Sequence, residues 1–161
     1  MQLGILTAPF ADASLVQVAD WAAAAGLEPL EIACWPSAGG DKRRYAGTAH
    51  IAVEDLTQSR ADEIAQSIAA RGLTISALGY YPNPLHADAA HRAAVLAHLK
   101  KVIIAARLLN VGVVNTFVGG DRTQSLDQNW ARAAAIFPDI IAFARDAGVP
   151  LALDTPPLPL S

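Results

Sequence analysis

The sequence has few of the features that mark a secreted or a nucleic-acid-binding protein. Its 161 residues include one cysteine, Cys34, so no disulfide can form within the chain, which fits a reducing compartment. Charged residues make up 17% of the sequence and the formal net charge is −3. Nucleic-acid-binding proteins usually carry a basic surplus, and the short cluster at 42–44 does not supply one.

Long hydrophobic runs are also missing. Charged residues interrupt every apolar stretch well before the roughly 18 residues that a membrane span needs. The first residues, MQLGILTAPFADAS, lack the basic segment of a signal peptide and reach an acidic residue at Asp12. We therefore expect a soluble cytoplasmic protein that binds neither membranes nor nucleic acid.

One unit is repeated along the chain: a helical segment, then a glycine or asparagine, then an apolar strand. The closing residues are Gly26, Gly72, Asn110 and Gly148, and these residue types tolerate the left-handed conformation that ends a helix. They lie 46, 38 and 38 residues apart, about the length that a helix, a strand and two short loops require.

Five apolar segments are predicted to be strands, and most lack polar alternation, as strands covered on both faces do. Alternating strands and helices indicate an α/β fold with right-handed crossovers. The segments are LGILTA (3–8), PLEIACW (29–35), LTISALGYY (73–81), VGVVNTFV (111–118) and VPLALD (149–154). Our candidates for side chains that face the inside of a curved sheet are Ile5, Ile32, Ile75, Val114 and Leu153.

Four helices are expected between these strands, each beginning near a residue that can cap it. The third helix carries His91 and His98, which we expect to be exposed. The fourth contains Pro138, which predicts a kink or a break near residues 134–138. The capping candidates are Asp12 or Ser14, Thr57 or Ser59, Asp88, and Ser125 or Asp127.

Two architectures share this order of elements: the (β/α)8 barrel and the open, doubly wound sheet. The count of five strands favours the open sheet. The C-terminal sequence does not, because an open sheet would normally add a fifth helix, and Pro156, Pro157 and Pro159 exclude a regular helix there.

Candidate site residues lie at the carboxyl ends of the strands, where both architectures place function. Each has an alternative interpretation: Glu31 pairs with a cation, Trp35 and Phe117 cap the core, and His86 lies on the surface. Of two adjacent tyrosines in a strand, only one can face a site. The candidates are Glu31, Trp35, Tyr80 or Tyr81, His86, Thr116, Phe117 and Asp154.

Other motifs are weaker. The sequence VGGD at 118–121 precedes a helix, and it fits either a phosphate cradle or a plain turn. His50 lies in a long loop, where a site role is not favoured. There is no cluster of cysteines and histidines typical of zinc, no full glycine-rich nucleotide motif and no convincing Ser-His-Asp set. The residues alone indicate an α/β protein with a polar cleft.

Several longer motifs resemble the sugar phosphate isomerase/epimerase family of xylose-isomerase-like TIM barrels. They are KRRYAGTAHIAV, ISALGYYPNPLHAD, HLKKVIIAARLLNVGVVNTFVGGD and the closing LALD. The resemblance implies an α/β fold of the (β/α)8 TIM-barrel type, incomplete, with about five βα units. We expect a partial barrel over 1–154, strands in sequential order, helices on the outer face only, and a Pro-rich tail over 155–161.

The resemblance also implies a divalent metal, Mn²⁺, Mg²⁺, Co²⁺ or Zn²⁺, that assists proton transfer next to a sugar carbonyl. Asp154 stands where the family has its first metal carboxylate, which implies a catalytic and metal-binding role. The substrate implied is a sugar or a sugar phosphate. Its expected binding residues are Glu31, Trp35, Tyr81, His86, Thr116 and Phe117.

Three further ligand-bearing strands of that family have no counterpart here, so we expect a truncated chain, inactive alone, with weak metal affinity. The alternative is a non-catalytic barrel fragment or interaction module that self-associates through open strand edges or needs a partner. A DNA-repair endonuclease on the related barrel is disfavoured by the acidic charge balance and by the lack of further histidines at strand ends.

Overall fold

A computed structural model describes residues 2–37 and 47–154. The basic cluster at 42–44 and the Pro-rich tail predicted over 155–161 lie outside the described residues. The strands are β1 (Ile5–Leu6), β2 (Pro29–Ala33), β3 (Thr74–Gly79), β4 (Val114–Phe117) and β5 (Leu151–Asp154). The helices are α1 (Leu15–Ala24), α2 (Gln58–Ala69), α3 (Ala89–Leu108) and α4 (Leu126–Asp146).

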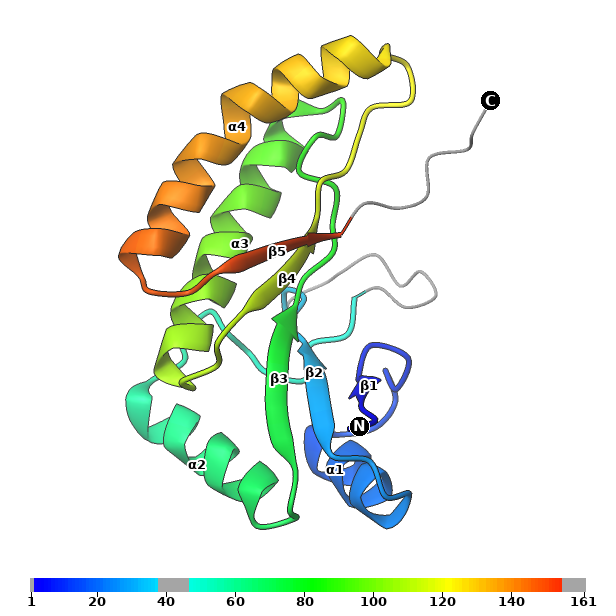
Figure 1. Ribbon diagram of the computed structural model, residues 1–161, viewed down its shortest axis with the longest axis vertical. Helices are drawn as coiled ribbons and strands as arrows, with labels where there is room; N and C mark the ends of the chain where they lie inside the picture. The colour runs from blue at the N-terminus through cyan, green and yellow to red at the C-terminus, as the bar shows by residue number, and fades with distance from the viewer. Residues whose placement is uncertain (1, 38–46, 155–161) are drawn as a thin grey trace.

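The five strands form one parallel sheet in the order β1-β2-β3-β4-β5. Figure 1 shows α2, α3 and α4 along one side of this curved sheet, and α1 contacts α2 in the same layer. A doubly wound sheet would instead reverse its strand order at one point and carry helices on both faces. The predicted partial barrel is therefore confirmed, and the open-sheet alternative is excluded.

Local sequence sets the helix boundaries much as predicted. Ser14 and Ser125 form capping boxes, and Thr57 and Asp88 accept backbone hydrogen bonds at the starts of α2 and α3. The residues that follow the helices adopt the expected left-handed conformation, including Asn110 with a φ of 54°. These signals are local, so they can be read without knowledge of the tertiary fold.

Helix α4 continues through Pro138 as one helix, so of the predicted kink or break near residues 134–138 the break is wrong, and the kink stays a prediction. A proline removes one backbone donor and crowds the preceding turn, but the helix still runs over 21 residues, Leu126–Asp146. Pro138 also lies on an exposed face, where water can bind the carbonyl that loses its partner. The helix is capped by Ser125, which adds further support.

The core fills the space between the sheet and the helices. Leu30, Ile32, Leu78 and Val114 project from the strands into this layer and are fully buried. The opposite, concave face of the sheet is the inside of the partial barrel. Each strand therefore directs alternate side chains to the helix layer and to the barrel interior.

The five aliphatic side chains predicted to face the barrel interior lie on the helix side instead. Ile32 and Val114 are fully buried there, and Ile5 and Ile75 pair in register with Leu30, which faces the same layer. Leu153 lies beside α4. The physical reason is the two-residue alternation of a strand, because Ile32 adjoins Glu31 and Leu153 adjoins Asp154.

His98 is buried rather than exposed, so that prediction is wrong. Its side chain is 6% exposed, and Nε2 donates a hydrogen bond to the carbonyl of Cys34 at 2.9 Å. The ring also packs against Tyr80, with 4.6 Å between centroids. His98 points inward because it lies along the part of α3 that packs on the sheet, whereas His91, seven residues earlier in the first turn of the helix, is exposed as expected.

Within residues 2–37 and 47–154, no helix combines the length and the apolar character that crossing a membrane requires.

Candidate functional site

Tyr81 is the centre of a polar cluster at the carboxyl ends of the strands, on the concave face. Its hydroxyl donates a hydrogen bond to Oε1 of Glu31, and the side chains of Asn115 and Asp154 lie near the same hydroxyl. The ring of Phe117 packs on Tyr81 with 4.8 Å between centroids. We call Glu31, Tyr81, Asn115, Phe117 and Asp154 the mouth cluster.

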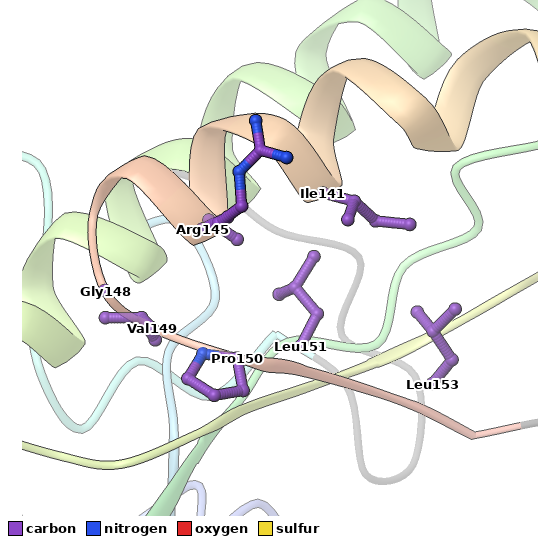
Figure 2. Close-up of a pocket in the computed structure, with 8 residues that line it drawn as sticks. Ile141, Arg145, Gly148, Val149, Pro150, Leu151 and Leu153 are labelled. Carbon is purple, nitrogen blue, oxygen red and sulfur yellow. The ribbon is translucent and has the colours of Figure 1, made fainter.

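Strand register explains why residues from four segments meet here. Asn115 pairs with Gly79, and Phe117 pairs with Asp154, and paired residues of parallel strands project from the same face. Asp154 thus shares its face with Phe117, while its neighbour Leu153 points to α4 (Figure 2).

Gly79 makes room for the contact between Glu31 and Tyr81. A Cβ atom at this position would lie 2.6 Å from Oε1 of Glu31 and 3.0 Å from the ring of Tyr81. The first distance is too short for any side chain. The sequence therefore needs glycine at the end of β3 if the two side chains are to meet.

The electrostatics of the cluster keep Tyr81 protonated. Burial raises the pKa of Tyr81, and the hydrogen bond to Glu31 with the charges of Glu31 and Asp154 raises it further, against an opposing effect of Asn115. The phenol is a hydrogen-bond donor throughout the neutral pH range. It can therefore hold a carboxylate on one side and accept a hydrogen bond from a ligand hydroxyl on the other.

Two predicted site residues lie away from the mouth cluster. Thr116 is 1% exposed and points to the helix side, since its neighbours Asn115 and Phe117 point to the concave side. His86 is exposed on the loop before α3, where Nδ1 accepts a hydrogen bond from the backbone of Asp88. The structure therefore does not bring either of them to the cluster.

The aromatic residues divide between the two faces. Tyr80 is 3% exposed and packs towards α3, so Tyr81 is the tyrosine that faces the concave side, as a strand requires. Trp35 is buried, with its ring 6.0 Å from that of Tyr81 and 5.9 Å from that of Tyr80. Trp35 thus packs against the rings of both tyrosines.

Asn115 is a member of the cluster that the sequence interpretation missed. The available signal was the alternation within β4, because a strand that directs Phe117 to a site must direct Asn115 there too. The same rule that separates Tyr80 from Tyr81 also separates Thr116 from Phe117.

The loop VGGD is a structural turn. The backbone N–H of Gly120 donates to Oδ1 of Asn83, and that of Asp121 donates to Oδ1 of Asn129. The carboxylate of Asp121 accepts from Thr123 and pairs with Arg132 at 3.2 Å, and these hydrogen bonds hold the pKa of Asp121 below its usual range. Because these amides have protein partners, the loop does not offer them to a phosphate.

His50 connects the end of β1 to the start of α1. Its Nε2 donates to the carbonyl of Ala13 at 3.0 Å, which leaves Nδ1 to accept from the hydroxyl of Thr7 at 2.8 Å. Thr7 in turn accepts from the backbone N–H of Ala33. With all its polar atoms engaged, His50 has a structural role here, in agreement with the sequence interpretation.

The residues of the mouth cluster do not by themselves fit a divalent metal. Within 2–37 and 47–154, no three side chains of His, Cys, Asp or Glu come together as a metal site would need. Asp154 contributes one carboxylate, and Glu31 is engaged with Tyr81. A cation held by one carboxylate and water would bind weakly.

An α/β chain with sequential parallel strands, helices on one face and polar side chains at the carboxyl ends of the strands defines the TIM-barrel class of protein. Within that class the chain belongs to the xylose isomerase-like TIM barrel family, whose model matches residues 19–158. A comparison with curated proteins found no match.

Solved structures share the fold at low sequence identity. One is a D-psicose 3-epimerase from Clostridium cellulolyticum H10 with D-tagatose, at 19% identity and a TM-score of 0.68, covering 95% of this chain and 52% of that one. A D-psicose 3-epimerase in the presence of D-fructose has 20% identity, a TM-score of 0.67 and coverages of 95% and 52%.

A sugar phosphate isomerase/epimerase from Parabacteroides distasonis ATCC 8503 has 15% identity and a TM-score of 0.62, with 96% of this chain and 51% of that chain covered. The chain thus spans about half the length of these solved structures. At such identities the likeness concerns the fold.

Proposed function

We propose that the mouth cluster binds a sugar and takes part in isomerisation or epimerisation, in which a proton moves next to a carbonyl. The observation that carries this proposal is the hydrogen bond between Tyr81 and the Glu31 carboxylate, with the carboxylate of Asp154 on the same face at the end of β5, where its charge raises the pKa of Tyr81. Family membership supports the same reading, since relatives of this fold include sugar epimerases.

Each residue of the cluster has a chemical role in this proposal. The carboxylate of Asp154 accepts a proton from the carbon next to the sugar carbonyl, which leaves an enediolate. In an isomerisation it returns the proton to the neighbouring carbon on the same face, while the proton of the hydroxyl there passes to the former carbonyl oxygen. In an epimerisation the opposite face of the original carbon takes a proton from water, and Asp154 gives its own proton back to solvent. Glu31 orients the Tyr81 hydroxyl, which accepts a hydrogen bond from a sugar hydroxyl, and Phe117 offers an apolar surface to the sugar carbons.

The proposal favours a neutral sugar over a sugar phosphate as the substrate. The mouth cluster carries two carboxylates, Glu31 and Asp154. In the VGGD loop, the backbone N–H groups of Gly120 and Asp121 donate to the side chains of Asn83 and Asn129. A phosphate at this position would meet negative charge without compensation from these groups. A cytoplasmic location is also part of the proposal, since a chain with a single cysteine fits a reducing compartment.

Two measurements test the proposal in the 161-residue chain. Saturation-transfer NMR with D-fructose and D-tagatose measures binding, and deuterium incorporation at the carbon next to the carbonyl measures proton transfer. We expect binding that Tyr81→Phe weakens, and incorporation that Asp154→Asn abolishes. Asp127→Asn is a matched control because Asp127 is an exposed carboxylate on α4, away from the cluster. Absence of sugar binding in the unaltered chain would contradict the proposal.

A second candidate is a non-catalytic binding or interaction module. The specific observation in its favour is that the described residues bring no third metal-ligating side chain to the two carboxylates. The same experiment separates the candidates, because a module would bind sugar without deuterium incorporation. Self-association through the edge strands β1 and β5 belongs to this second candidate.

A further inference from the structure

We propose that His98, which lies between α3 and the sheet, is a positioning residue for the mouth cluster on the opposite face. It acts through the peptide group between Cys34 and Trp35, which its side chain holds in place. The ring of Trp35 then fixes the position of Tyr81, the residue at the centre of the cluster. Only the expected effect on sugar binding rests on the proposed function.

The peptide group between Cys34 and Trp35 is held at both of its polar atoms. Its carbonyl oxygen accepts the hydrogen bond from Nε2 of His98 at 2.9 Å, and its N–H donates to the carbonyl of Thr48 at 3.1 Å. Thr48 is itself fixed, because its hydroxyl donates to the carbonyl of Ala8 at 2.8 Å. The place of this peptide, and of the Trp35 side chain that follows it, therefore depends on a side chain from α3.

The same peptide lies where the regular pairing of β2 changes. The N–H of Cys34 still donates to the carbonyl of Gly79, the last residue of β3, at 3.0 Å. The N–H of Trp35 instead pairs with Thr48, in the segment that leads to α2. Cys34 is fully buried, and a buried carbonyl without a donor is unfavourable. His98 thus supplies, from the helix layer, the donor that this carbonyl needs at the end of the strand.

Aromatic contacts extend from Trp35 to the mouth cluster. The ring of Trp35 lies 6.0 Å from that of Tyr81, whose hydroxyl donates to Glu31. It also lies 5.9 Å from the ring of Tyr80, on which His98 packs at 4.6 Å. Rings packed this closely cannot move independently, because the protein interior has little free space. A shift of Trp35 would therefore move the Tyr81 hydroxyl relative to Glu31.

The protonation state of His98 suits this role. The Cys34 carbonyl can only accept, so the proton of the neutral ring lies on Nε2. Burial lowers the pKa of His98, and the charge of Lys101 adds to this effect, whereas the Cys34 carbonyl and Glu54 oppose it. At pH 7.5 the ring is therefore neutral and its hydrogen bond to Cys34 is in place.

Carbon-13 NMR of the full 161-residue chain, labelled at Cζ of tyrosine, tests the proposal at pH 7.5. The Cζ resonance of Tyr81 is identified by its loss in Tyr81→Phe, and it reports the hydrogen bond of the hydroxyl to Glu31. His98→Gln and His98→Met introduce side chains of similar size, of which only glutamine has an N–H donor for the Cys34 carbonyl. We expect His98→Gln to keep the resonance in place, and His98→Met to move it towards its position in the urea-unfolded chain.

His91→Met is the matched control, because His91 is exposed on the same helix. It makes the same exchange without touching the peptide before Trp35, so the Tyr81 resonance should not move. Circular dichroism establishes that each variant is folded under the conditions of the measurement. If His98→Met does not fold, His98→Asn replaces it, since the asparagine amide is one methylene shorter than that of glutamine and ends short of the carbonyl.

Titration with D-fructose measures the consequence for the site. His98→Met should weaken binding about fivefold, as the loss of one hydrogen bond of ordinary strength would. In a Tyr81→Phe background the same change should have little further effect, because residues that act through one contact are not additive. A histidine with a merely structural role would lower the urea midpoint without either of these changes.

The proposal is overturned if His98→Met leaves the Tyr81 resonance in place. It is also overturned if His98→Gln and His98→Met move the resonance equally, since the hydrogen bond would then not be the link. The resonance is measured without sugar. A resonance that moves as expected, in a chain that binds no D-fructose, therefore supports the role of His98 and contradicts the proposed function alone.

Discussion

The contact between Glu31 and Tyr81 is possible because residue 79 is a glycine and has no Cβ atom. Glu31 comes from the middle of β2 and Tyr81 from just past the end of β3. Their side chains meet over Gly79, which is the nearest backbone between them. A site built this way is sensitive to a single methyl group.

Gly79→Ala should therefore destabilise the protein and separate Glu31 from Tyr81. The added methyl would overlap Oε1 of Glu31, and overpacking of this kind costs about 1–3 kcal/mol. Gly112→Ala is the control, because a Cβ there meets no atom within 4 Å. Urea unfolding measures both variants, and equal midpoints for the two would show that the close approach at Gly79 has no energetic consequence.

The burial of His98 gives the protein a pH dependence of known sign. Burial lowers the pKa of His98, with the Cys34 carbonyl and Glu54 opposing and Lys101 adding to the effect. In the unfolded chain the pKa returns to about 6.5. Between the two values the unfolded chain binds more protons, so stability falls as the pH drops below about 6.5, until the folded protein also becomes protonated.

Unfolding in urea at pH 7.5 and at pH 5.5 checks this expectation. His98→Gln keeps a donor near the Cys34 carbonyl and removes the titration, so it should reduce the loss of stability at low pH. Burial also lowers the pKa of His50, which acts with the same sign, so part of the loss should remain. His91→Gln is the matched control on the same helix, since His91 is exposed. An undiminished loss in His98→Gln would contradict the argument.

Among the elements, α4 carries an energetic cost inside an otherwise regular helix. Pro138 lies in the thirteenth position of 21 residues and cannot donate to the preceding turn. An interior proline costs about 3 kcal/mol relative to alanine. The capping box at Ser125, the buried face and Arg145 near the C-terminus offset part of that cost.

Pro138→Ala should consequently raise the free energy of unfolding, by up to about 3 kcal/mol. Its exposed position means that no core contact is lost in the exchange. Thermal unfolding followed by circular dichroism gives the shift. A decrease in stability would mean that the proline contributes more by restricting the unfolded chain than it costs within the helix.

At the scale of the whole molecule, the concave face is less apolar than the sequence interpretation assumed. It presents the mouth cluster, with Glu31, Asn115 and Asp154, while most of the large aliphatic residues of the strands lie against the helices; Leu6, which pairs with Glu31, is an exception. Ile32 and Val114 are fully buried without any further strand. Leu153, at 42% exposed, is the member of the five predicted residues that is most accessible.

We therefore expect the isolated chain to unfold cooperatively. Fluorescence of the three tryptophans and far-ultraviolet circular dichroism should report the same urea midpoint, as they do for a two-state domain. Protein concentration should be varied, because self-association through the edge strands β1 and β5 would raise the midpoint with concentration. Separate transitions for the two probes would show that part of the sheet unfolds on its own.

The sequence by itself determined the order and type of the elements and the caps. These follow from short-range physics: a glycine or asparagine that closes a helix, and a serine that caps the next. The sequential order of the strands was implied by the resemblance to the family, because a right-handed crossover is common to the barrel and the open sheet. The carboxyl-end position of Asp154 and Tyr81 followed from the same reading. Applied to β4, the alternation of side chains along a strand would also have placed Asn115 at the site and Thr116 on the helix side.

Only the tertiary structure decided which of these side chains meet. The register between β2 and β3 shifts between Leu30 and Glu31, and that irregularity, together with the room at Gly79, brings Glu31 to Tyr81. His98 is buried because α3 turns that face to the sheet, and the amides of Gly120 and Asp121 are occupied because Asn83 and Asn129 reach them. Contacts between segments far apart in sequence depend on packing geometry, which local residue preferences do not encode.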